Sequence, residues 1–253
     1  GMKSTPYPED ALVCWAAKRV GRPVKWVASR SDALMSDAHA RDQLMHGELA
    51  LDANGKILAV RAEGFQNIGA YTVAATLVPS EISLKFIPNV YAIPAAYLVT
   101  RGTFSNTSPL TSYRGAGRPE ACYVIEGLVD RAARELGIDR AELRRCNLIS
   151  PAAMPFKTAL AFTYDCGEFE AVLDKALKLA EWSTFDARRA EAAKRGKLRG
   201  IGIANPIERA AGPPGAETVQ MRFDASGSLT LCVGTTSQGQ GHETMYKVIA
   251  SDV

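Results

Sequence analysis

Thr111-Ser-Tyr-Arg-Gly-Ala-Gly-Arg-Pro-Glu120 is the stretch that decides the fold, because a glycine-rich loop here passes directly into a long amphipathic segment. Apolar residues recur at helical spacing from Pro119 to Leu136, which predicts a helix over this range. Gly137 follows the last apolar residue, where a glycine commonly ends a helix. The sequence therefore predicts a loop that opens onto a helix N-terminus.

The loop has the residue types of an anion or oxyanion site. Gly115 and Gly117 allow the backbone to approach a ligand closely, and a helix N-terminus offers free N–H groups and a positive dipole end. Arg114 and Arg118 add cationic donors on either side of Ala116. A tight turn with solvent-facing arginines has the same pattern, and the spacing alone supports both interpretations about equally.

A second glycine-rich stretch, Gly234-Thr-Thr-Ser-Gln-Gly-Gln-Gly-His-Glu-Thr244, separates a predicted strand from a helix that begins near Met245. The amides of Gln238 and Gln240 pair a donor with an acceptor, which suits a heterocycle such as a pterin. The Lys-Ser/Thr ending of a phosphate-binding P-loop is absent. A flexible linker is the alternative, and His242 is either a packing or capping residue or a general base.

Two further patterns predict β-hairpins, with turns at Asn54-Gly55 and Ser226-Gly227. The expected strands are 48–52 with 57–62, and 217–223 with 228–233. Helices are expected at 7–20, 139–147 and 169–181, and single strands at 23–28 and 200–204. We therefore predict an α+β fold with hairpin-rich sheet segments and packed helices. The expected domains are 1–182 and 200–253, joined by a linker or solvated helix at 183–199.

Composition excludes several classes of protein. The 253 residues include 30 Lys+Arg and 27 Asp+Glu, a balance that argues against a nucleic-acid-coating protein. The longest apolar run, Ala11–Ala17, is too short to span a bilayer, and no signal-peptide core is evident, so we expect a cytoplasmic protein without a membrane partner.

The cysteines and histidines constrain the metal chemistry. The five cysteines form no CxxC pair, which predicts reduced, mostly buried thiols. The three histidines have no metal-ligand spacing. No protein-ligated metal site is therefore expected, and a metal would have to arrive inside an organic cofactor.

Several motifs, in this order along the chain, resemble the large molybdopterin-binding subunit of the xanthine dehydrogenase/aldehyde oxidase family, and more narrowly its carbon-monoxide-dehydrogenase-like form II branch. They are His39 with Arg41-Asp42, Gly69-Ala-Tyr71, Tyr113-Arg-Gly-Ala-Gly-Arg118, Val129-Asp-Arg-Ala-Ala-Arg-Glu-Leu-Gly-Ile138, Tyr164-Asp-Cys-Gly-Glu168 and Gly239-Gln-Gly-His-Glu-Thr244. The ordered set is specific, although each motif alone is weak.

The resemblance implies a molybdenum–molybdopterin cofactor, with or without a cytosine dinucleotide, and oxidative hydroxylation of an aldehyde or an N-heterocycle. It implies that electrons leave through iron–sulfur and FAD subunits. Arg114 would orient or polarise the substrate oxygen. The cofactor-binding residues would be Gly115, Ala116, Gly117, Arg118, Gln238, Gly239, Gln240 and Gly241.

The chain also departs from the family pattern. Gly1-Met2-Lys3 resembles only the end of a cofactor-contacting loop, and the family's catalytic glutamate is expected beyond Val253. Copper-containing relatives carry a cysteine where this chain has Gly115. We therefore expect a partial subunit, with two truncated molybdopterin-binding domains, that is inactive alone and pairs with a complementary C-terminal portion or with a second copy. A non-catalytic cofactor-binding or scaffold domain is the alternative.

Overall fold

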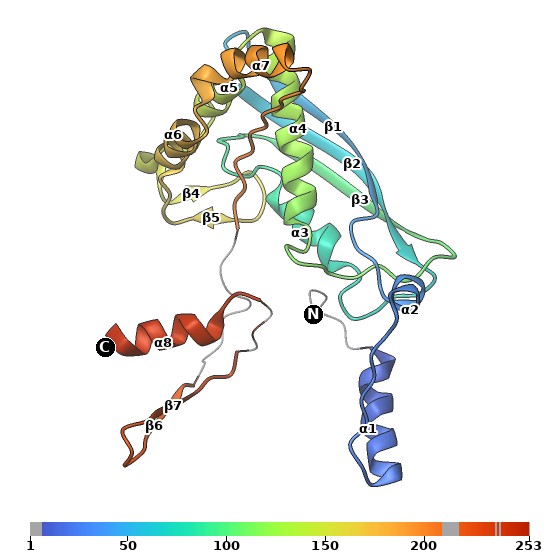
Figure 1. Ribbon diagram of the computed structural model, residues 1–253. Helices are drawn as coiled ribbons and strands as arrows, with labels where there is room; N and C mark the ends of the chain where they lie inside the picture. The colour runs from blue at the N-terminus through green and yellow to red at the C-terminus, as the bar shows by residue number, and fades with distance from the viewer. Residues whose placement is uncertain (1–6, 209–217, 236, 238, 253) are drawn as a thin grey trace. The chain divides into compact units, whose positions relative to one another are not determined.

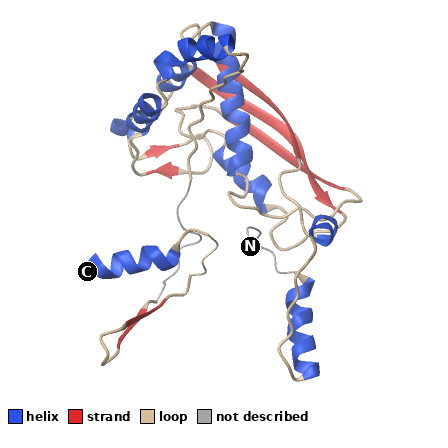
Figure 2. Cartoon of the chain, in the orientation of Figure 1, coloured by secondary structure: helices blue, strands red, loops and turns tan. Residues whose placement is uncertain are grey.

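The computed structural model describes residues 7–208, 218–235, 237 and 239–252 (Figure 1). These residues fall into two compact units, one within Lys3–Glu208 and one within Arg209–Val253. The chain contains both helices and largely antiparallel strand pairs (Figure 2), which confirms the predicted α+β class.

A three-stranded sheet forms the centre of the first unit. Strand β1 (Gln43–Leu51) pairs antiparallel with β2 (Ile57–Gly69), and β2 pairs parallel with β3 (Ala96–Phe104). Helix α3 (Val78–Phe86) makes the crossover between the two parallel strands (Figure 1). The predicted hairpin is confirmed, with longer strands than expected, whereas α3 and β3 were not predicted.

The turn of this hairpin is set by Asp52 and Gly55. The Asp52 carboxylate accepts hydrogen bonds from the N–H groups of Asn54 at 2.9 Å and Lys56 at 2.8 Å. Gly55 has φ 81°, a left-handed conformation that glycine adopts without strain. The Asn147 side chain donates to the Gly55 carbonyl oxygen at 2.8 Å and so connects the turn to the residues that directly follow helix α5 (Arg140–Arg145).

Helix α4 (Arg118–Leu136) contacts β1 and α3 and supplies much of the core, as the sequence predicts. Its residues Ala121, Ile125, Val129 and Ala133 are fully or almost fully buried, together with sheet and loop residues that include Val60, Ala62, Ile87 and Tyr91. Gly137 ends the helix at φ 67°, as expected from its position. The apolar spacing that predicts the helix is thus the spacing of its buried face.

Shorter elements complete the first unit. They are α1 (Pro8–Val20), α2 (Arg30–Ser36), α5 (Arg140–Arg145), the small pair β4 (Phe156–Lys157) and β5 (Thr163–Tyr164), α6 (Phe169–Leu179), α7 (Phe185–Lys194), and the 3₁₀ turns Pro151–Ala153 and Trp182–Thr184. The helices predicted at 7–20, 139–147 and 169–181 are confirmed, each ending at or before its predicted limit. In the described part of the chain, no helix combines the length and apolar character needed to cross a membrane.

A buried ion pair connects α4 and α5 to the segment that leaves α7. The fully buried Arg144 side chain donates from Nε to Glu126 Oε2 at 2.8 Å and from Nη2 to the Ile203 carbonyl oxygen at 3.2 Å. Tyr91 donates its hydroxyl to the other Glu126 oxygen at 2.6 Å, and burial, followed by the charge of Glu126, raises the pKa of Tyr91. Such a pair stabilises only while both partners are present.

Two predicted strands are wrong. Residues 23–28 form no strand, because no segment of the described chain pairs with them, and Trp26 and Val27 are exposed. Residues 200–204 also lack strand pairing. Two of their carbonyl oxygens, at Ile201 and Ile203, accept instead from arginine side chains of α5. Apolar and β-branched residues favour an extended backbone in both segments, but a β-strand also needs a neighbouring strand to form hydrogen bonds with.

The predicted burial of the thiols is also wrong. All five cysteines are free, but only Cys122 is partly buried and the other four are exposed. Cys14 illustrates the reason, because α1 buries none of its residues in this unit. Burial raises the pKa of the Cys122 thiol to about 11.

The second unit consists of the hairpin β6 (Gln220–Phe223) and β7 (Leu229–Cys232), followed by α8 (His242–Asp252). The predicted hairpin is confirmed, although Glu217 lies outside the described residues. Leu229 and Leu231 pair with Phe223 and Met221 across the ladder, so the apolar residues share one face as expected. The helix predicted near Met245 begins three residues earlier.

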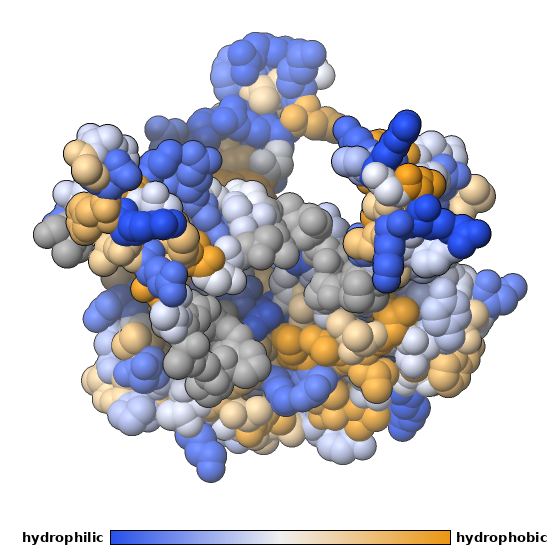
Figure 3. Space-filling model, turned by 90° about the horizontal axis from the view of Figure 1, so that it is seen from below, coloured by the Kyte–Doolittle hydropathy of each residue, from blue (hydrophilic) through white to orange (hydrophobic). Residues whose placement is uncertain are grey.

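Large apolar side chains are exposed in both units. Trp15 is 62% exposed and Phe223 is 78% exposed. Figure 3 shows apolar side chains gathered in patches among hydrophilic ones on the face that it presents. Contiguous exposed apolar surface of this kind is typical of interaction surfaces.

Candidate functional site

The predicted site loop is a tight turn at the start of α4. Three consecutive residues have positive φ, Gly115 at 92°, Ala116 at 41° and Gly117 at 96°. The Ala116 N–H donates to the Tyr113 carbonyl oxygen at 2.7 Å, and the Arg118 N–H donates to the Gly115 carbonyl oxygen at 3.1 Å. The two glycines are therefore required by the backbone conformation.

Gly117 is also required by close packing against α3. A Cβ at this position would lie 2.7 Å from the Ser83 backbone nitrogen and would collide with the Pro79 carbonyl oxygen. The buried Gln66 side chain, from β2, fixes the start of α3 by donating to the Thr76 carbonyl oxygen at 2.8 Å and accepting from Ser80. The sheet thus positions α3, and α3 positions the loop.

Arg118 is committed to contacts inside the first unit. Its Nη1 donates to the Gly115 carbonyl oxygen at 3.2 Å, its Cζ lies 4.7 Å from the centroid of the Phe86 ring, and its Nε lies 2.5 Å from Glu208 Oε1. The side chain is only 19% exposed. This arrangement stabilises the turn and holds Glu208 beside the start of α4.

Arg114 is placed differently. Its side chain is exposed, and no described residue forms a hydrogen bond or ion pair with its guanidinium group. No described residue accepts a hydrogen bond from the Gly115 N–H either. A cation and a backbone donor are therefore adjacent in sequence, both without a partner in the described part of the chain, which is the donor set that an anion or a polarised carbonyl oxygen requires.

A groove of about 1290 Å³ extends from this loop along α4 and β1. Gly115, Arg118, Pro119 and Tyr123 line it on the helix side. Glu120 also lines it, with a side chain that is only 10% exposed and an Oε2 atom that accepts no hydrogen bond from the described residues. The groove is mostly apolar with a few polar groups, the usual character of a small-molecule site.

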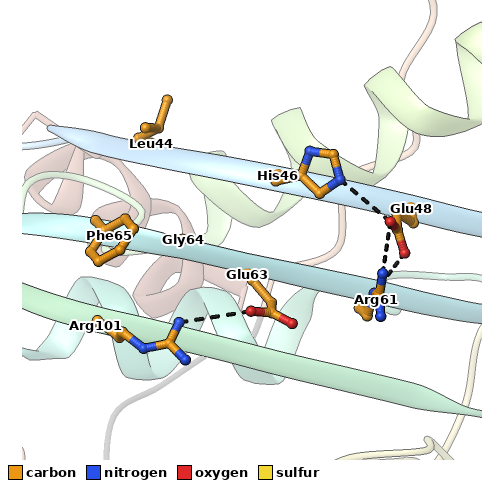
Figure 4. A pocket seen from close by; sticks show the side chains of 8 residues that line it. All are labelled: Leu44, His46, Glu48, Arg61, Glu63, Gly64, Phe65 and Arg101. Carbon is orange, nitrogen blue, oxygen red and sulfur yellow. Dashed lines mark hydrogen bonds and ion pairs between the residues drawn. The ribbon is translucent and has the colours of Figure 1, made fainter.

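A smaller pocket of about 370 Å³ lies on the sheet surface (Figure 4). Glu48 accepts from Arg61 at 2.6 Å, and Glu63 lies 3.7 Å from Arg101. Leu44 and Phe65 lie beside these ion pairs (Figure 4). None of the predicted site residues lines this pocket, and its charges already pair with one another, so we assign the site to the groove.

The second predicted loop precedes α8. Gly239 and Gly241 have φ of 105° and 74°, and no atom of the described chain lies within 4 Å of the position that a Cβ would occupy on either one. The Met245 N–H donates to the Gly241 carbonyl oxygen at 2.9 Å, so α8 begins directly after this glycine. Gln240 is exposed beside them, and Gln238 lies outside the described residues.

His242 packs against Tyr246, with ring centroids 5.3 Å apart. Its Nδ1 atom is buried and has no hydrogen-bond partner in the described residues, and no carboxylate there pairs with the ring. The contact with Tyr246 fits the packing interpretation, whereas a general base would need a partner that orients the ring.

Each loop fits the kind of cofactor that the sequence implies. The backbone at Gly239 and Gly241 has open space beside it directly before α8, as the approach of a phosphate or a pterin edge requires, and Arg114 offers a cation at the other loop. The two loops belong to separate units. The described residues contain no group of three or more His, Cys, Asp or Glu side chains that could hold a metal ion.

Three supporting residues were not predicted from the sequence. Gln66 and Glu120 are polar residues in otherwise apolar segments. From sequence alone such residues are expected on the surface, and only the structure shows that the Gln66 side chain is buried and that of Glu120 almost buried. Arg41 was noted only as part of a resembling motif, yet it contacts the site loop directly.

The fold and the site together define an α+β cofactor-binding domain with a glycine-rich backbone cradle at a helix N-terminus. The sequence pattern of molybdopterin cofactor-binding domains matches residues 1–148, and a second such pattern matches residues 175–253. The chain belongs to the molybdopterin cofactor-binding domain family, and the predicted resemblance to molybdopterin-binding subunits of the xanthine dehydrogenase family is confirmed.

Relatives match the whole chain. It is 31% identical to subunit gamma of the 6-hydroxypseudooxynicotine dehydrogenase complex of Paenarthrobacter nicotinovorans and 33% identical to the carbon monoxide dehydrogenase large chain of Hydrogenophaga pseudoflava. The matches cover 100% of this chain and 32% and 34% of those proteins. The fold superposes on quinoline 2-oxidoreductase from Pseudomonas putida 86 with a TM-score of 0.86 and 30% identity, over 100% of this chain and 34% of that one. The chain thus spans about a third of the length of these relatives.

Proposed function

We propose that this chain is the cofactor-holding part of a molybdenum hydroxylase large subunit, which oxidises an aldehyde or an N-heterocycle. The observation that carries the proposal is the exposed Arg114 beside the Gly115 N–H, neither of which has a partner among the residues that the structure describes. The molybdenum cofactor supplies the two-electron oxidation when it is bound. Arg114 orients the substrate and stabilises negative charge that develops on its oxygen or ring nitrogen.

The cofactor contacts are divided between the two loops. Gly115, Ala116 and Gly117 offer backbone at the first loop, and Arg118 holds that backbone in place by donating to the Gly115 carbonyl oxygen. In the second loop, Gln238, Gly239, Gln240 and Gly241 would contact the pterin and its phosphate. The open glycine backbone before α8 suits a pyrophosphate, which supports the cytosine dinucleotide form of the cofactor.

The substrate is an N-heterocycle or an aldehyde rather than carbon monoxide. Gly115 has no side chain and so offers no copper ligand in the loop. Several relatives are named for nitrogen heterocycles, including a nicotine 6-hydroxylase large subunit of Paenarthrobacter nicotinovorans and the quinoline enzyme. The mostly apolar groove beside Gly115 suits a planar aromatic ring.

The assembly is proposed from the length and names of the relatives, which include a subunit gamma and a large chain. We propose iron–sulfur and FAD subunits as electron acceptors, and two molybdopterin-binding domains at 1–182 and 200–253 connected through 183–199. Since the relatives are about three times as long, turnover requires further segments, supplied by a complementary chain or a second copy. Four exposed free cysteines support a reducing, cytoplasmic location.

Molybdenum content and turnover test the proposal. The chain is co-expressed with a chain equivalent to the remaining two thirds of its relatives, and the complex is assayed for molybdenum, released nucleotide, and oxidation of quinoline and benzaldehyde. We expect stoichiometric molybdenum and a cytosine nucleotide, with kcat about 100-fold lower in Arg114→Ala at unchanged molybdenum content. Arg101→Ala, an exposed arginine on the sheet, is the matched control.

Each contrary result has a defined meaning. A folded complex without molybdenum contradicts the proposal and favours a scaffold domain. A complex that contains molybdenum and turns over normally with Arg114→Ala contradicts only the role given to Arg114.

A further inference from the structure

Arg41 contacts the site loop at three places, although it lies 73 residues before Arg114 in the sequence. Its Nη2 donates a hydrogen bond to the Arg114 carbonyl oxygen. Its Cζ lies 5.0 Å from the centroid of the Tyr113 ring, and its Nε lies 4.0 Å from Glu120 Oε2. One side chain therefore contacts residues on both sides of the Gly115–Gly117 turn.

The backbone of Arg41 is itself held in an unfavourable conformation. Its φ is 59°, which is rare for a residue other than glycine and is retained only where the surroundings enforce it. The surroundings do so on both sides. His39 exchanges backbone hydrogen bonds with Pro109 and Thr111 at 2.9 and 2.8 Å, and the Asp42 carbonyl oxygen accepts from the Asn67 N–H at 3.0 Å.

The bond to Arg114 fixes the orientation of one peptide group. The carbonyl oxygen of Arg114 and the N–H of Gly115 belong to the same trans peptide and point in opposite directions. Because Arg41 binds the oxygen, the Gly115 N–H faces away from Arg41. Glycine at 115 would otherwise let this peptide rotate at little energetic expense.

We infer that Arg41 is a positioning residue that clamps the Arg114–Gly115 peptide, so that the Gly115 N–H and the backbone of Arg114 stay in one orientation for a ligand oxygen. The inference deepens the proposed function, on which the identity of that ligand rests. An arginine is needed because its planar fork can donate to the carbonyl oxygen, stack on Tyr113 and face Glu120 at the same time. A lysine offers only a point charge.

Amide NMR on the cofactor-free, 27.2 kDa chain tests the clamp directly. The variants are Arg41→Lys and Arg41→Gln, with Arg101→Gln as the matched control on the exposed sheet surface. In the unaltered chain and the control we expect a rigid Gly115 amide, with an order parameter of about 0.85. In both Arg41 variants we expect that value to fall below about 0.6. Exchange of the Ala116 and Arg118 amides should accelerate about 10- to 100-fold, because the guanidinium bond to the Arg114 carbonyl oxygen no longer holds the turn.

The pattern of change separates a clamp from a general stabiliser. Amides of β2 and of α4 beyond its first turn should remain unchanged in Arg41→Lys. If the loop amides keep their order in both variants, or if the whole domain loses protection to the same extent as the loop, the inference is wrong.

A second readout separates this inference from the proposed function. In the reconstituted complex, Arg41→Lys should lower kcat about 10-fold at unchanged molybdenum content, and it should do so only if Arg114 acts on the substrate. Arg114→Lys should leave the order of the Gly115 amide intact. A disordered loop with normal turnover contradicts the proposed role of Arg114 and leaves the clamp standing, whereas an ordered loop in both Arg41 variants refutes the clamp whatever the activity.

Discussion

Replacing Gly117 by alanine tests whether α3 holds the site loop rigidly. Gly117 precedes α4 at φ 96°, and Gly137 follows the same helix at φ 67°. The two glycines therefore share a left-handed backbone at opposite ends of one helix. Their surroundings differ, because a Cβ on Gly137 would have no atom within 4 Å, whereas a Cβ on Gly117 would collide with α3. Gly137→Ala is thus the matched control for Gly117→Ala.

The expected loss of stability follows from these two differences. A left-handed alanine costs about 1–2 kcal/mol at either position. At Gly117 the new methyl group also lies 2.7 Å from the Ser83 nitrogen and overlaps the Pro79 carbonyl oxygen, both in the backbone of α3. Forcing extra volume into a packed site adds about 1–3 kcal/mol. We expect Gly117→Ala to lose roughly 2–5 kcal/mol and Gly137→Ala roughly 1–2 kcal/mol.

Urea unfolding followed by circular dichroism measures both losses on the same chain. The effect of alanine on the unfolded state is the same for both variants, so their difference isolates the contact with α3. Equal losses for the two variants would refute the rigid contact and show that α3 moves to accommodate the methyl group. The loop would then depend on its own hydrogen bonds and on Arg41.

Three further outcomes are expected. Arg144→Met should lower stability by about 3–5 kcal/mol in urea unfolding, because it leaves the Glu126 carboxylate buried without its cation, and adding Glu126→Leu should restore much of the loss. Burial raises the pKa of Tyr91 and raises that of Tyr164 to about 12, so stability should be full below pH 10 and should fall between pH 10 and 12 by up to about 1.4 kcal/mol per pH unit for each tyrosine; a flat profile would contradict this. Arg114→Gln should change stability by less than about 0.5 kcal/mol, and a larger loss in the same assay would reveal a structural partner for Arg114.

Local signals were sufficient to predict the elements that contain the site. The Asn54-Gly55 turn and the glycines around Ala116 are required by backbone conformation, which depends on few neighbours. The helix from Arg118 was predictable because its buried face repeats every three to four residues. These signals are local in sequence, so a single chain reveals them.

The contacts that hold the site could not be predicted in the same way. The strand predicted at 23–28 shows the limit, since its residues favour extended chain but find no partner strand among the described residues. Gln66 is a buried polar residue that the sequence does not predict. Its side-chain amide is fully buried in a strand because Thr76 and Ser80 supply its hydrogen-bond partners after folding. Both depend on residues that meet only after folding.

The site loop therefore depends on two kinds of residue that respond differently to substitution. Gly115 and Gly117 allow the backbone to adopt the positive φ angles of the turn, which would be strained for other residues. They do not select it, because a glycine permits many conformations equally well. Two contacts favour this one conformation of the turn. Arg41 binds the Arg114 carbonyl oxygen on one side, and α3 packs on Gly117 on the other. Substituting a glycine should thus reduce stability, whereas substituting Arg41 should mainly reduce order in the loop, and the two effects are separable in one set of variants.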